Sequence, residues 1–350
     1  MIKPYFNINL DEYNFIIEKI SQKNIIKFKN KKILISGATG FIGKWLVGSL
    51  LNIDNIYKLN LKINIISRKT KKVNIDNFKD FKDLRIYFIK TDIEKINKIN
   101  LGKQDIFINL ATDTSKTKVN DVNYVFNTVI KGTKNIVEAL KKNHIPKIIH
   151  ASSGAAYGDY KIPKDGYKET VNQNRNFFND NNFYGLAKKK SEDILLNYSN
   201  SSKTNIIILR IFSLIGSHFP LNSHYAISNF TKNALSNKNI KILGNGKDIR
   251  TYMDICDLII WIIKIMIKNK NKSKIINAGS NEKINILSLA KKIIKISKSN
   301  SKILLNKNKK NHEIRHKYFP NLNLAKKNNL INYVKLNKSI YKYILSIKNK

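Results

Sequence analysis

The hydrophobic positions of this chain form short runs that alternate with longer amphipathic stretches. From Lys32 onward, runs rich in isoleucine, leucine and phenylalanine are bounded by polar residues, a pattern typical of strands buried on both faces. The predicted strands are 33–35, 63–66, 86–89, 106–110, 148–150 and 206–211. Helical patterns separate most of them, and one runs from Phe41 to about Leu51. This alternation predicts right-handed crossovers and a doubly wound, parallel α/β sheet covered on both faces.

The two ends of the chain follow other patterns. Residues 1–30 predict an extension with one amphipathic helix, which Asp11 can cap and whose apolar face carries Leu10, Phe15, Ile16, Ile17 and Ile20. Beyond residue 212 helical patterns dominate, at 225–234, 255–267, 284–296 and the lysine-rich C-terminus. We therefore expect a sheet domain at 31–212 and a smaller, mostly helical lobe at 213–350, with some exchange of segments between them. Such a lobe would close over the carboxyl edge of the sheet, where open α/β sheets bind ligands.

The charge of the chain says little about its function. Lys and Arg number 65 against 24 Asp and Glu, a net charge of +41 that ordinarily suggests a nucleic acid or an anionic membrane as partner. The excess is almost entirely lysine, spread along the chain among isoleucine and asparagine, as an AT-biased coding sequence would produce. Dispersed lysines are typical of solvated helix faces. We therefore expect no specific nucleic-acid partner.

Cysteine and hydropathy patterns indicate the compartment. The single cysteine, Cys256, cannot form an internal disulfide, and six scattered histidines suggest no metal cluster. No signal peptide is readable at the N-terminus, and the longest apolar run, 258–267, is half the length of a membrane span. We expect a cytoplasmic protein without a bound metal or a membrane span.

A glycine-rich segment joins the first predicted strand to the first predicted helix. Gly37, Gly40 and Gly43 stand in the spacing GxxGxxG, with Thr39, Phe41 and Ile42 between them. Such glycines permit a tight turn, close approach of the backbone to a pyrophosphate, and close packing of helix on strand, while the helix N-terminus offers amide donors. The segment predicts a dinucleotide site in a Rossmann-type sheet, and the alternative is a glycine turn without a ligand.

Residues after the next two strands bear on which dinucleotide binds. The second strand ends in Ser67 and Arg68, where an NAD-selective site usually places a carboxylate for the ribose 2′-hydroxyl. An arginine there suits a 2′-phosphate, so NADP is slightly favoured over NAD, although a solvated loop cation is the alternative. Asp92 and Ile93 follow the third strand, where an adenine amino group is expected, and a turn carboxylate is an equal alternative.

A tyrosine and a lysine four residues apart are the candidate catalytic pair. Tyr184 and Lys188 share one face of a helix that begins near Phe183. A phenol is a weak base at neutral pH, and both a lysine cation and a positively charged nicotinamide favour its phenolate. Ser153 follows the fifth predicted strand at the carboxyl edge, where its hydroxyl can bond a substrate oxygen that undergoes hydride transfer.

With these motifs the chain resembles an extended short-chain dehydrogenase/reductase of the NAD-dependent epimerase/dehydratase family, which acts on nucleotide sugars. The resemblance covers most of the chain from Lys31 onward. It includes Leu110 with Ala111, Asn127 with Gly132 and Thr133, segment 210–216, segment 244–252, Asp257 and segment 277–280.

The resemblance implies a role for each matching residue. Ser153 and Tyr184 would be the catalytic hydroxyls, Lys188 would hold the nicotinamide ribose, and Leu110, Ala111 and Asn127 would contact the cofactor. A nucleotide-sugar substrate would be bound by Ser153, Asn229, Arg250 and Arg315. Arginine forms bidentate phosphate contacts that lysine cannot reproduce, which suits Arg250 to a diphosphate. An ion pair of Arg250 with Asp254 or Asp257 is the structural alternative.

Departures from the family pattern narrow the reaction. Dehydrating and decarboxylating members carry acidic residues just after the catalytic hydroxyl, whereas this chain has Gly154 and Ala155. A 4,6-dehydratase is disfavoured unless Glu169 or Asp113 reaches the site. Ser213 stands where many relatives have asparagine, and Ser217 with His218 where many have proline, so sugar recognition differs in detail.

We therefore expect a nucleotide-sugar epimerase that works through a 4-keto intermediate with NAD(P). The first alternative is an NADPH-dependent reductase of a 4-keto-6-deoxy sugar, followed by the dehydratase and by a non-catalytic dinucleotide-binding protein. The sequence leaves the oligomeric state open, and a homodimer is the alternative to a monomer because such relatives commonly dimerise through helices beside the sheet. The N-terminal extension, which is outside the core family fold, would pack on the flank of the sheet or contribute to that dimer.

Overall fold

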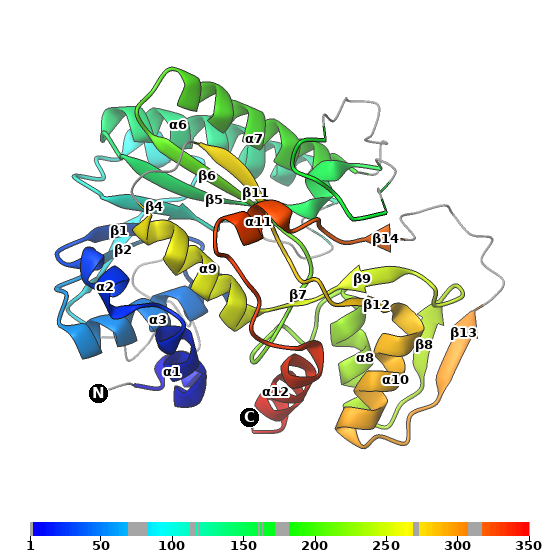
Figure 1. Ribbon diagram of the computed structural model, residues 1–350. Coiled ribbons are helices and arrows are strands. Elements are labelled where there is room, and N and C mark those ends of the chain that lie inside the picture. Colours follow the sequence, from blue (N-terminus) through cyan, green and yellow to red (C-terminus); the bar gives the residue numbers. More distant parts are fainter. Residues whose placement is uncertain are drawn as a thin grey trace.

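The computed structural model contains a seven-stranded parallel sheet with helices on both faces (Figure 1). It describes residues 3–68, 83–112, 117, 120–159, 162, 164–171, 182–268, 273–306 and 317–349. The strand order is β11-β6-β5-β4-β1-β2-β3, and every neighbouring pair is parallel. The predicted doubly wound α/β sheet is thereby confirmed. Its strands are β1 Lys32–Ser36, β2 Lys62–Ser67, β3 Ile86–Lys90, β4 Ile106–Asn109, β5 Lys147–Ser153, β6 Asn205–Ile211 and β11 Lys274–Ala278.

Alternation of side chains along the strands fills two hydrophobic layers. In β1, Ile33 and Ile35 join a buried cluster on one face, while Leu34 joins a second cluster on the other. Successive residues of a strand point to opposite faces, so the continuous apolar runs in the sequence supply both layers. One layer is covered by α3 Phe41–Tyr57 and α9 Ile255–Ile267, and the other by α6 Gly132–Lys142 and α7 Phe183–Asn200.

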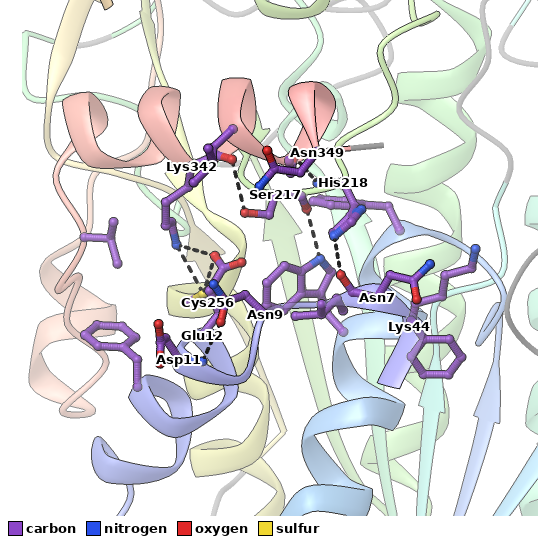
Figure 2. Close-up of a pocket in the computed structure, with 18 of the residues that line it drawn as sticks. Asn7, Asn9, Asp11, Glu12, Lys44, Ser217, His218, Cys256, Lys342 and Asn349 are labelled. Atoms are coloured by element: carbon purple, nitrogen blue, oxygen red, sulfur yellow. Dashed lines mark hydrogen bonds and ion pairs between the residues drawn. The ribbon is translucent and has the colours of Figure 1, made fainter. Parts of the chain in front are cut away.

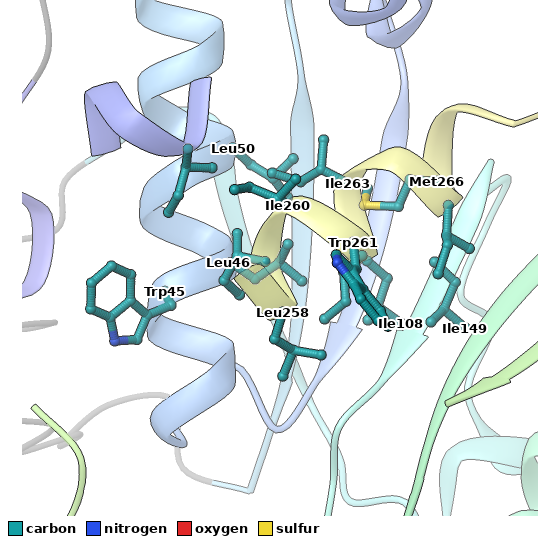
Figure 3. Close-up of a cluster of buried hydrophobic side chains, with 14 of the residues drawn as sticks. Trp45, Leu46, Leu50, Ile108, Ile149, Leu258, Ile260, Trp261, Ile263 and Met266 are labelled. Atoms are coloured by element: carbon teal, nitrogen blue, oxygen red, sulfur yellow. The ribbon is translucent and has the colours of Figure 1, made fainter. Parts of the chain in front are cut away.

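Two segments beyond residue 212 belong to the sheet and its covering layer. Strand β11 pairs with β6, which adds a seventh strand to the six that were predicted. Helix α9 is buried along nearly its whole length, and Figure 3 shows Ile260 toward Leu46 and Leu50 of α3, with Trp261 toward Ile108 of β4. The chain therefore returns to the sheet after it has begun the second lobe.

The second lobe has its own hydrophobic core, in which three helices pack with short strands (Figure 1). The helices are α8 Ala226–Leu235, α10 Ile286–Ser297 and α12 Leu336–Lys348. The strands form three small sheets: β7 Leu214–Ile215 with β10 Met253–Asp254; β8 Ile240–Leu243 with β13 Ile303–Asn306; and β9 Ile249–Thr251 with β12 Lys283–Asn285 and β14 Lys317–Tyr318. Helix α11 Asn323–Lys327 packs near β11.

The N-terminal extension packs against α3 and α9 of the same chain. It contains η1 Tyr5–Asn7, α1 Leu10–Glu18, α2 Gln22–Ile25 and η2 Ile26–Phe28, so the prediction of a single helix was too simple. Asn9, not Asp11, caps α1 by accepting a hydrogen bond from the Asp11 amide. Tyr13, Ile16, Ile17 and Ile20 are buried, whereas Leu10 is exposed, so the apolar face differs at its first residue.

The remaining short helices connect the strands of the sheet. They are η3 Ile96–Lys98, α5 Val122–Tyr124, η4 Val125–Lys131 and η5 Gly154–Tyr157. Across the described ranges, none of the helices has the length and hydrophobicity needed to span a membrane.

A substitution at Gly48 tests how closely the extension packs on α3. A Cβ atom at Gly48 would lie 2.0 Å from the Tyr13 hydroxyl oxygen and 2.7 Å from Cζ of the same ring. In an exposed helix, Gly→Ala stabilises by about 1 kcal/mol. Here we expect Gly48→Ala to lower the free energy of unfolding by about 1–3 kcal/mol, as overpacking does. Urea unfolding measures this, and unchanged or increased stability would contradict the close contact of α1 with α3.

Candidate active site

The glycine-rich loop between β1 and α3 is held by close backbone contacts. Gly37 has a φ of +71°, and a Cβ there would lie 2.6 Å from the carbonyl carbon and oxygen of Leu110 at the end of β4. At Gly43 a Cβ would lie 2.3 Å from the Gly37 carbonyl oxygen. Both positions therefore exclude any side chain, and α3 begins directly against the carboxyl edge of the sheet.

This loop fits the phosphates of a dinucleotide. Helix α3 has Gly40 as its N-cap, and no side chain in the described ranges caps its first turn. Thr39 and Gly40 are exposed, while Phe41 and Ile42 are half-buried. The amides of the first helical turn thus stay available to an anion, as in other phosphate-binding helix termini.

Two of the other predicted cofactor residues lie beside this loop, and others lie at the end of β2 and on η4. Leu110 and Ala111 follow β4 beside Gly37, and Asn127 lies in η4, a π-helical turn of a kind often found at functional sites. Ser67 ends β2 half-buried, and Arg68 after it is exposed.

Asp92 and Ile93, after β3, differ in their surroundings. The side chain of Ile93 is buried in the core against Gly132, so only its backbone is placed to contact a ligand. The Oδ1 atom of Asp92 is buried without a hydrogen-bond partner among the described residues. A buried acceptor without a partner is costly, and an adenine amino group would satisfy it.

Ser153, Tyr184 and Lys188 meet at the carboxyl edge of the sheet. Ser153 is the last residue of β5, which runs three residues further than predicted. Its side chain accepts a hydrogen bond from the Ala155 amide and is close enough to Tyr184, the second residue of α7, to lower the pKa of that phenol. The Nζ of Lys188 lies 5.7 Å from the centre of the Tyr184 ring and donates to the Ala151 carbonyl at 2.9 Å and to the Thr112 hydroxyl at 3.0 Å. The structure therefore brings the three predicted catalytic side chains together.

Burial tunes the proton affinities of this cluster. Burial raises the pKa of Tyr184 well above its usual value, the nearby phenols of Tyr225 and Tyr318 raise it further, and the hydrogen bond with Ser153 opposes the shift. Burial also lowers the pKa of Lys188 to about 8, against the carboxylate of Glu192. A cation beside Tyr184 would therefore favour the phenolate strongly, because a buried site contains little water that could itself stabilise the charged form.

A buried ion pair next to this cluster joins α7 to β6. Arg210 of β6 donates from Nη2 to Glu192 of α7 at 2.6 Å, and both side chains are almost fully buried. The Ser152 hydroxyl of β5 donates to the same carboxylate at 2.5 Å. Beside it His150 contacts Asn109 at 2.9 Å, and burial keeps the pKa of this imidazole well below its ordinary value.

The predicted substrate residues lie in the second lobe. Arg250, on β9, is half-buried, and its Nη2 lies 3.6 Å from Asp248. The alternative that it pairs with Asp254 or Asp257 is wrong, because Asp254 pairs with Lys342 and Asp257 accepts the amides of Tyr333 and Val334. Asn229 is exposed in the first turn of α8, and Arg315 lies outside the described residues.

Of the two acids that could support dehydration, the structure describes only Glu169. Glu169 accepts a hydrogen bond from the Asn277 amide at 2.9 Å, and burial raises the pKa of its carboxyl. Asp113 lies outside the described residues.

Tyr318 is a residue of the site that the sequence did not indicate. Its hydroxyl oxygen would lie 2.3 Å from a Cβ at Gly154, and its ring is 4.8 Å from that of Phe212. Its register neighbour on β9 is Arg250. A lone tyrosine in a two-residue strand carries no local signal of this position, because only the pairing of β14 with β9 brings it there.

The family to which the chain belongs can now be stated. The pattern that defines the NAD dependent epimerase/dehydratase family matches residues 33–279. The chain belongs to this family of enzymes. The predicted resemblance is thereby confirmed.

Similar proteins in the NAD dependent epimerase/dehydratase family differ in activity. A dTDP-D-glucose 4,6-dehydratase of Dictyostelium discoideum is 30% identical over 279 residues, which are 76% of this chain and 62% of that protein. A putative UDP-glucose 4-epimerase of Methanocaldococcus jannaschii is 27% identical over 262 residues, 73% of this chain and 78% of that one. The chain thus spans less than two thirds of the dehydratase relative.

Solved structures of the family share the fold. The UDP-N-acetylglucosamine 4-epimerase of Methanobrevibacter ruminantium M1, in complex with UDP-N-acetylmuramic acid, superposes with a TM-score of 0.76 at 22% identity, over 92% of this chain and 99% of that one. At 22% identity this similarity is evidence for the fold alone.

The lowered pKa of Lys188 predicts a pH-dependent stability. Between pH 8 and the ordinary lysine value of 10.5 the unfolded chain binds a proton at this site that the folded protein does not, so raising the pH stabilises the fold. Relative to Lys188→Met, the unfolding free energy of the wild type should rise by up to roughly 3 kcal/mol across this window. Lys190→Met, on the exposed face of the same helix, is the control and should follow the wild type. Denaturant titrations at several pH values measure the difference, and a constant difference would contradict the lowered pKa of Lys188.

Proposed function

We propose that this protein epimerises a nucleotide-linked hexose at C4 through a 4-keto intermediate. The observation that carries the proposal is the approach of Ser153 and Lys188 to the side chain of Tyr184. Beside them, a Cβ at Gly154 would lie 2.3 Å from the Tyr318 hydroxyl oxygen, which leaves no room for an acidic side chain. A bound nicotinamide dinucleotide would accept and return the hydride. The loop 37–43 and the orphaned carboxylate oxygen of Asp92 are where it would be held.

In this proposal the protein's own residues move and orient a proton. Tyr184 takes the proton of the C4 hydroxyl and later returns it, and Ser153 orients that hydroxyl. Lys188 stands close enough to the Tyr184 ring to favour the phenolate, and it would also bind the ribose. Arg250, half-buried on β9, would bind the substrate diphosphate with a bidentate contact, and Asn229 and Arg315 would assist it.

Steric exclusion at Gly154 favours epimerisation over dehydration or decarboxylation. Those reactions need an added acid or base next to the catalytic hydroxyl, and any Cβ at 154 would collide with Tyr318. Glu169, one of the two acids that could support dehydration, is instead bound to the Asn277 amide. An epimerase needs no further proton transfer, because the hydride is returned to the opposite face of the ketone.

A 4-keto reductase that uses NADPH is the second candidate. It is favoured by Arg68, which is exposed at the end of β2 where a 2′-phosphate would lie. The proposed preference for NADP over NAD rests on the same side chain.

We also propose a homodimer in the cytoplasm. Val122 is 49% exposed and Phe126 is 56% exposed on neighbouring turns beside the sheet, a surface that a second copy would cover. The free, buried Cys256 suits a reducing compartment.

Cofactor release and a substrate panel test the proposed activity. Mass spectrometry should find retained dinucleotide, and incubation with UDP-, dTDP-, CDP- and GDP-hexoses should interconvert C4 epimers without net redox change. Tyr184→Phe should reduce kcat by about a hundred- to ten-thousand-fold, because the proton acceptor is lost, while dinucleotide binding is kept. Consumption of NADPH only with a 4-keto sugar would favour the reductase. No turnover of either kind would favour a non-catalytic dinucleotide-binding protein.

Arg68→Gln tests the choice of cofactor. The loss of one phosphate contact should weaken NADP binding about tenfold and leave NAD binding within about twofold. Lys62→Gln, which removes an exposed cation at the other end of β2, is the control. Calorimetry with both dinucleotides measures this. Equal weakening of NAD and NADP would show that Arg68 does not contact the 2′-phosphate.

A further inference from the structure

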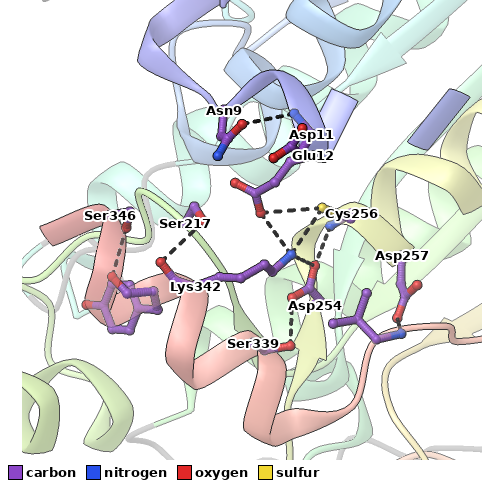
Figure 4. A network of polar contacts seen from close by, with 12 residues as sticks. Asn9, Asp11, Glu12, Ser217, Asp254, Cys256, Asp257, Ser339, Lys342 and Ser346 are labelled. Carbon is purple, nitrogen blue, oxygen red and sulfur yellow. Dashed lines mark hydrogen bonds and ion pairs between the residues drawn. The ribbon is translucent and has the colours of Figure 1, made fainter. Parts of the chain in front are cut away.

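The N-terminal helix α1 and the C-terminal helix α12 lie outside the range that matches the family, and they meet at Lys342 (Figure 4). The Nζ of Lys342 lies 2.8 Å from Glu12 of α1 and 3.2 Å from Asp254 of β10. Exposed fractions of these side chains are 14% for the lysine, 10% for Glu12 and 0% for Asp254. One cation therefore balances two carboxylates from two distant parts of the chain, almost out of contact with water.

Asp254 ties this cluster to α9. Its Oδ1 accepts the Cys256 amide at 2.9 Å and so caps α9, while its Oδ2 accepts the Ser339 hydroxyl of α12 at 2.6 Å. We call Glu12, Asp254, Ser339 and Lys342 the latch. The latch joins α1, α9 and α12 at one point.

The latch joins two separate hydrophobic cores. The apolar face of α12, with Ile340 and Tyr343, is buried in the core of the second lobe. Tyr13 and Ile16 of α1 are buried in the core on the sheet. Lys342 projects from α12, which is buried in the core of the second lobe, and meets Glu12 of α1, which is buried on the sheet. The latch therefore resists any displacement of the second lobe relative to the sheet.

Segment 217–219 links the latch to the glycine-rich loop (Figure 2). The His218 amide donates to Ser346 of α12 at 3.0 Å, and its ring Nε2 lies 3.0 Å from the carbonyl oxygen of Asn7. The next residue, Phe219, packs edge-on against Phe41 of the loop at 5.1 Å between ring centres. One cavity of about 1210 Å³ is lined by Asn7, Phe41, His218 and Ser346, together with Lys342 and Thr39.

We propose that the latch fixes the second lobe against the glycine-rich loop, and that Glu12 and Lys342 are positioning residues for the nucleotide-sugar site. The substrate half of this statement rests on the proposed function. The mechanical half does not, because it concerns only the contact between the lobe and the sheet.

The charges of the latch predict an order of effects. Removal of Lys342 leaves Glu12 and Asp254 buried together without a cation, so like charges repel in a medium of low dielectric. Removal of the Glu12 charge leaves a balanced pair of Lys342 with Asp254. Lys342→Met should therefore open the latch more than Glu12→Gln, and Lys342→Arg should keep it closed.

Cys256 is a built-in reporter of opening, because it is the only cysteine of the chain and is fully buried beside the latch. Its thiolate attacks an aromatic disulfide reagent, forming a mixed disulfide and releasing a coloured aromatic thiolate. Burial and the neighbouring carboxylates raise the pKa of this thiol, whereas Lys342 lowers it. Loss of Lys342 would thus slow the chemical step, so faster labelling of Lys342→Met can come only from opening.

We expect labelling to accelerate at least about tenfold in Lys342→Met, and by less in Glu12→Gln, as local opening becomes easier. Lys342→Arg should label within about twofold of the wild type. The same holds for Lys348→Met, the control, which removes an exposed cation from the end of α12. Circular dichroism checks that each variant is folded. If Lys342→Met does not fold, Glu12→Gln decides the result through hydrogen exchange of the α12 amides, which does not depend on the thiol pKa that Glu12 raises. Labelling of the folded variants at the wild-type rate would overturn the latch.

A second measurement tests the link to the substrate site. It uses the nucleotide hexose of the panel that wild-type protein turns over. Glu12→Gln and Lys342→Met should raise its KM about tenfold and change kcat less than about threefold, because the lobe is mispositioned while Ser153 and Tyr184 are intact. Recovery of KM in Lys342→Arg is expected. Accelerated labelling with an unchanged KM would overturn the positioning role, and absence of any wild-type turnover would count against the proposed function while the labelling result still decides the latch.

Discussion

One buried carboxylate, that of Glu192, holds together the three elements on which the candidate chemistry depends. It accepts from Arg210 of β6 and from Ser152 of β5, and it projects from α7, the helix that carries Tyr184 and Lys188. Ser153 follows Ser152 directly, so its distance from the phenol is set by this ion pair. A paired charge in a dry interior is costly to break and strongly directional. The distance between the two candidate catalytic hydroxyls therefore depends on an ion pair that contacts neither of them.

Much of the fold could be predicted from the sequence because parallel strands are buried on both faces and appear as unbroken apolar runs. Strand β11 was missed because its five residues include only two isoleucines between polar neighbours, and its place is decided by pairing with β6. Helix α3 extends to Tyr57, six residues beyond the predicted end. The prediction ended too early because the last turns contain polar residues, and two of these, Asn52 and Asp54, are buried in the structure.

The residues of the candidate site likewise fall into those that the sequence could locate and those that it could not. Ser153, Tyr184 and Lys188 were found because local spacing on a strand end and a helix face determines where they lie. Partners that depend on tertiary contacts were not: Asp248 beside Arg250, Tyr318 above Gly154 and Glu192 beneath the cluster. The extension was recognised as separate, yet Tyr13, its most important packing residue, was not named, since only the contact with Gly48 makes a tyrosine fit there.

The contact between Tyr318 and Gly154 also limits how this chain can change over evolutionary time. A Cβ at 154 would lie 2.3 Å from the Tyr318 hydroxyl oxygen and 2.9 Å from the Phe212 ring, so an acidic residue fits there only after both neighbours have made room. A smaller residue at 318, introduced first, opens a hole beside Phe212 before any acid fills it. Replacement of Gly154 is therefore coupled to changes at positions far away in the sequence, and a shift to a reaction class that needs an acid at 154 requires several coupled substitutions.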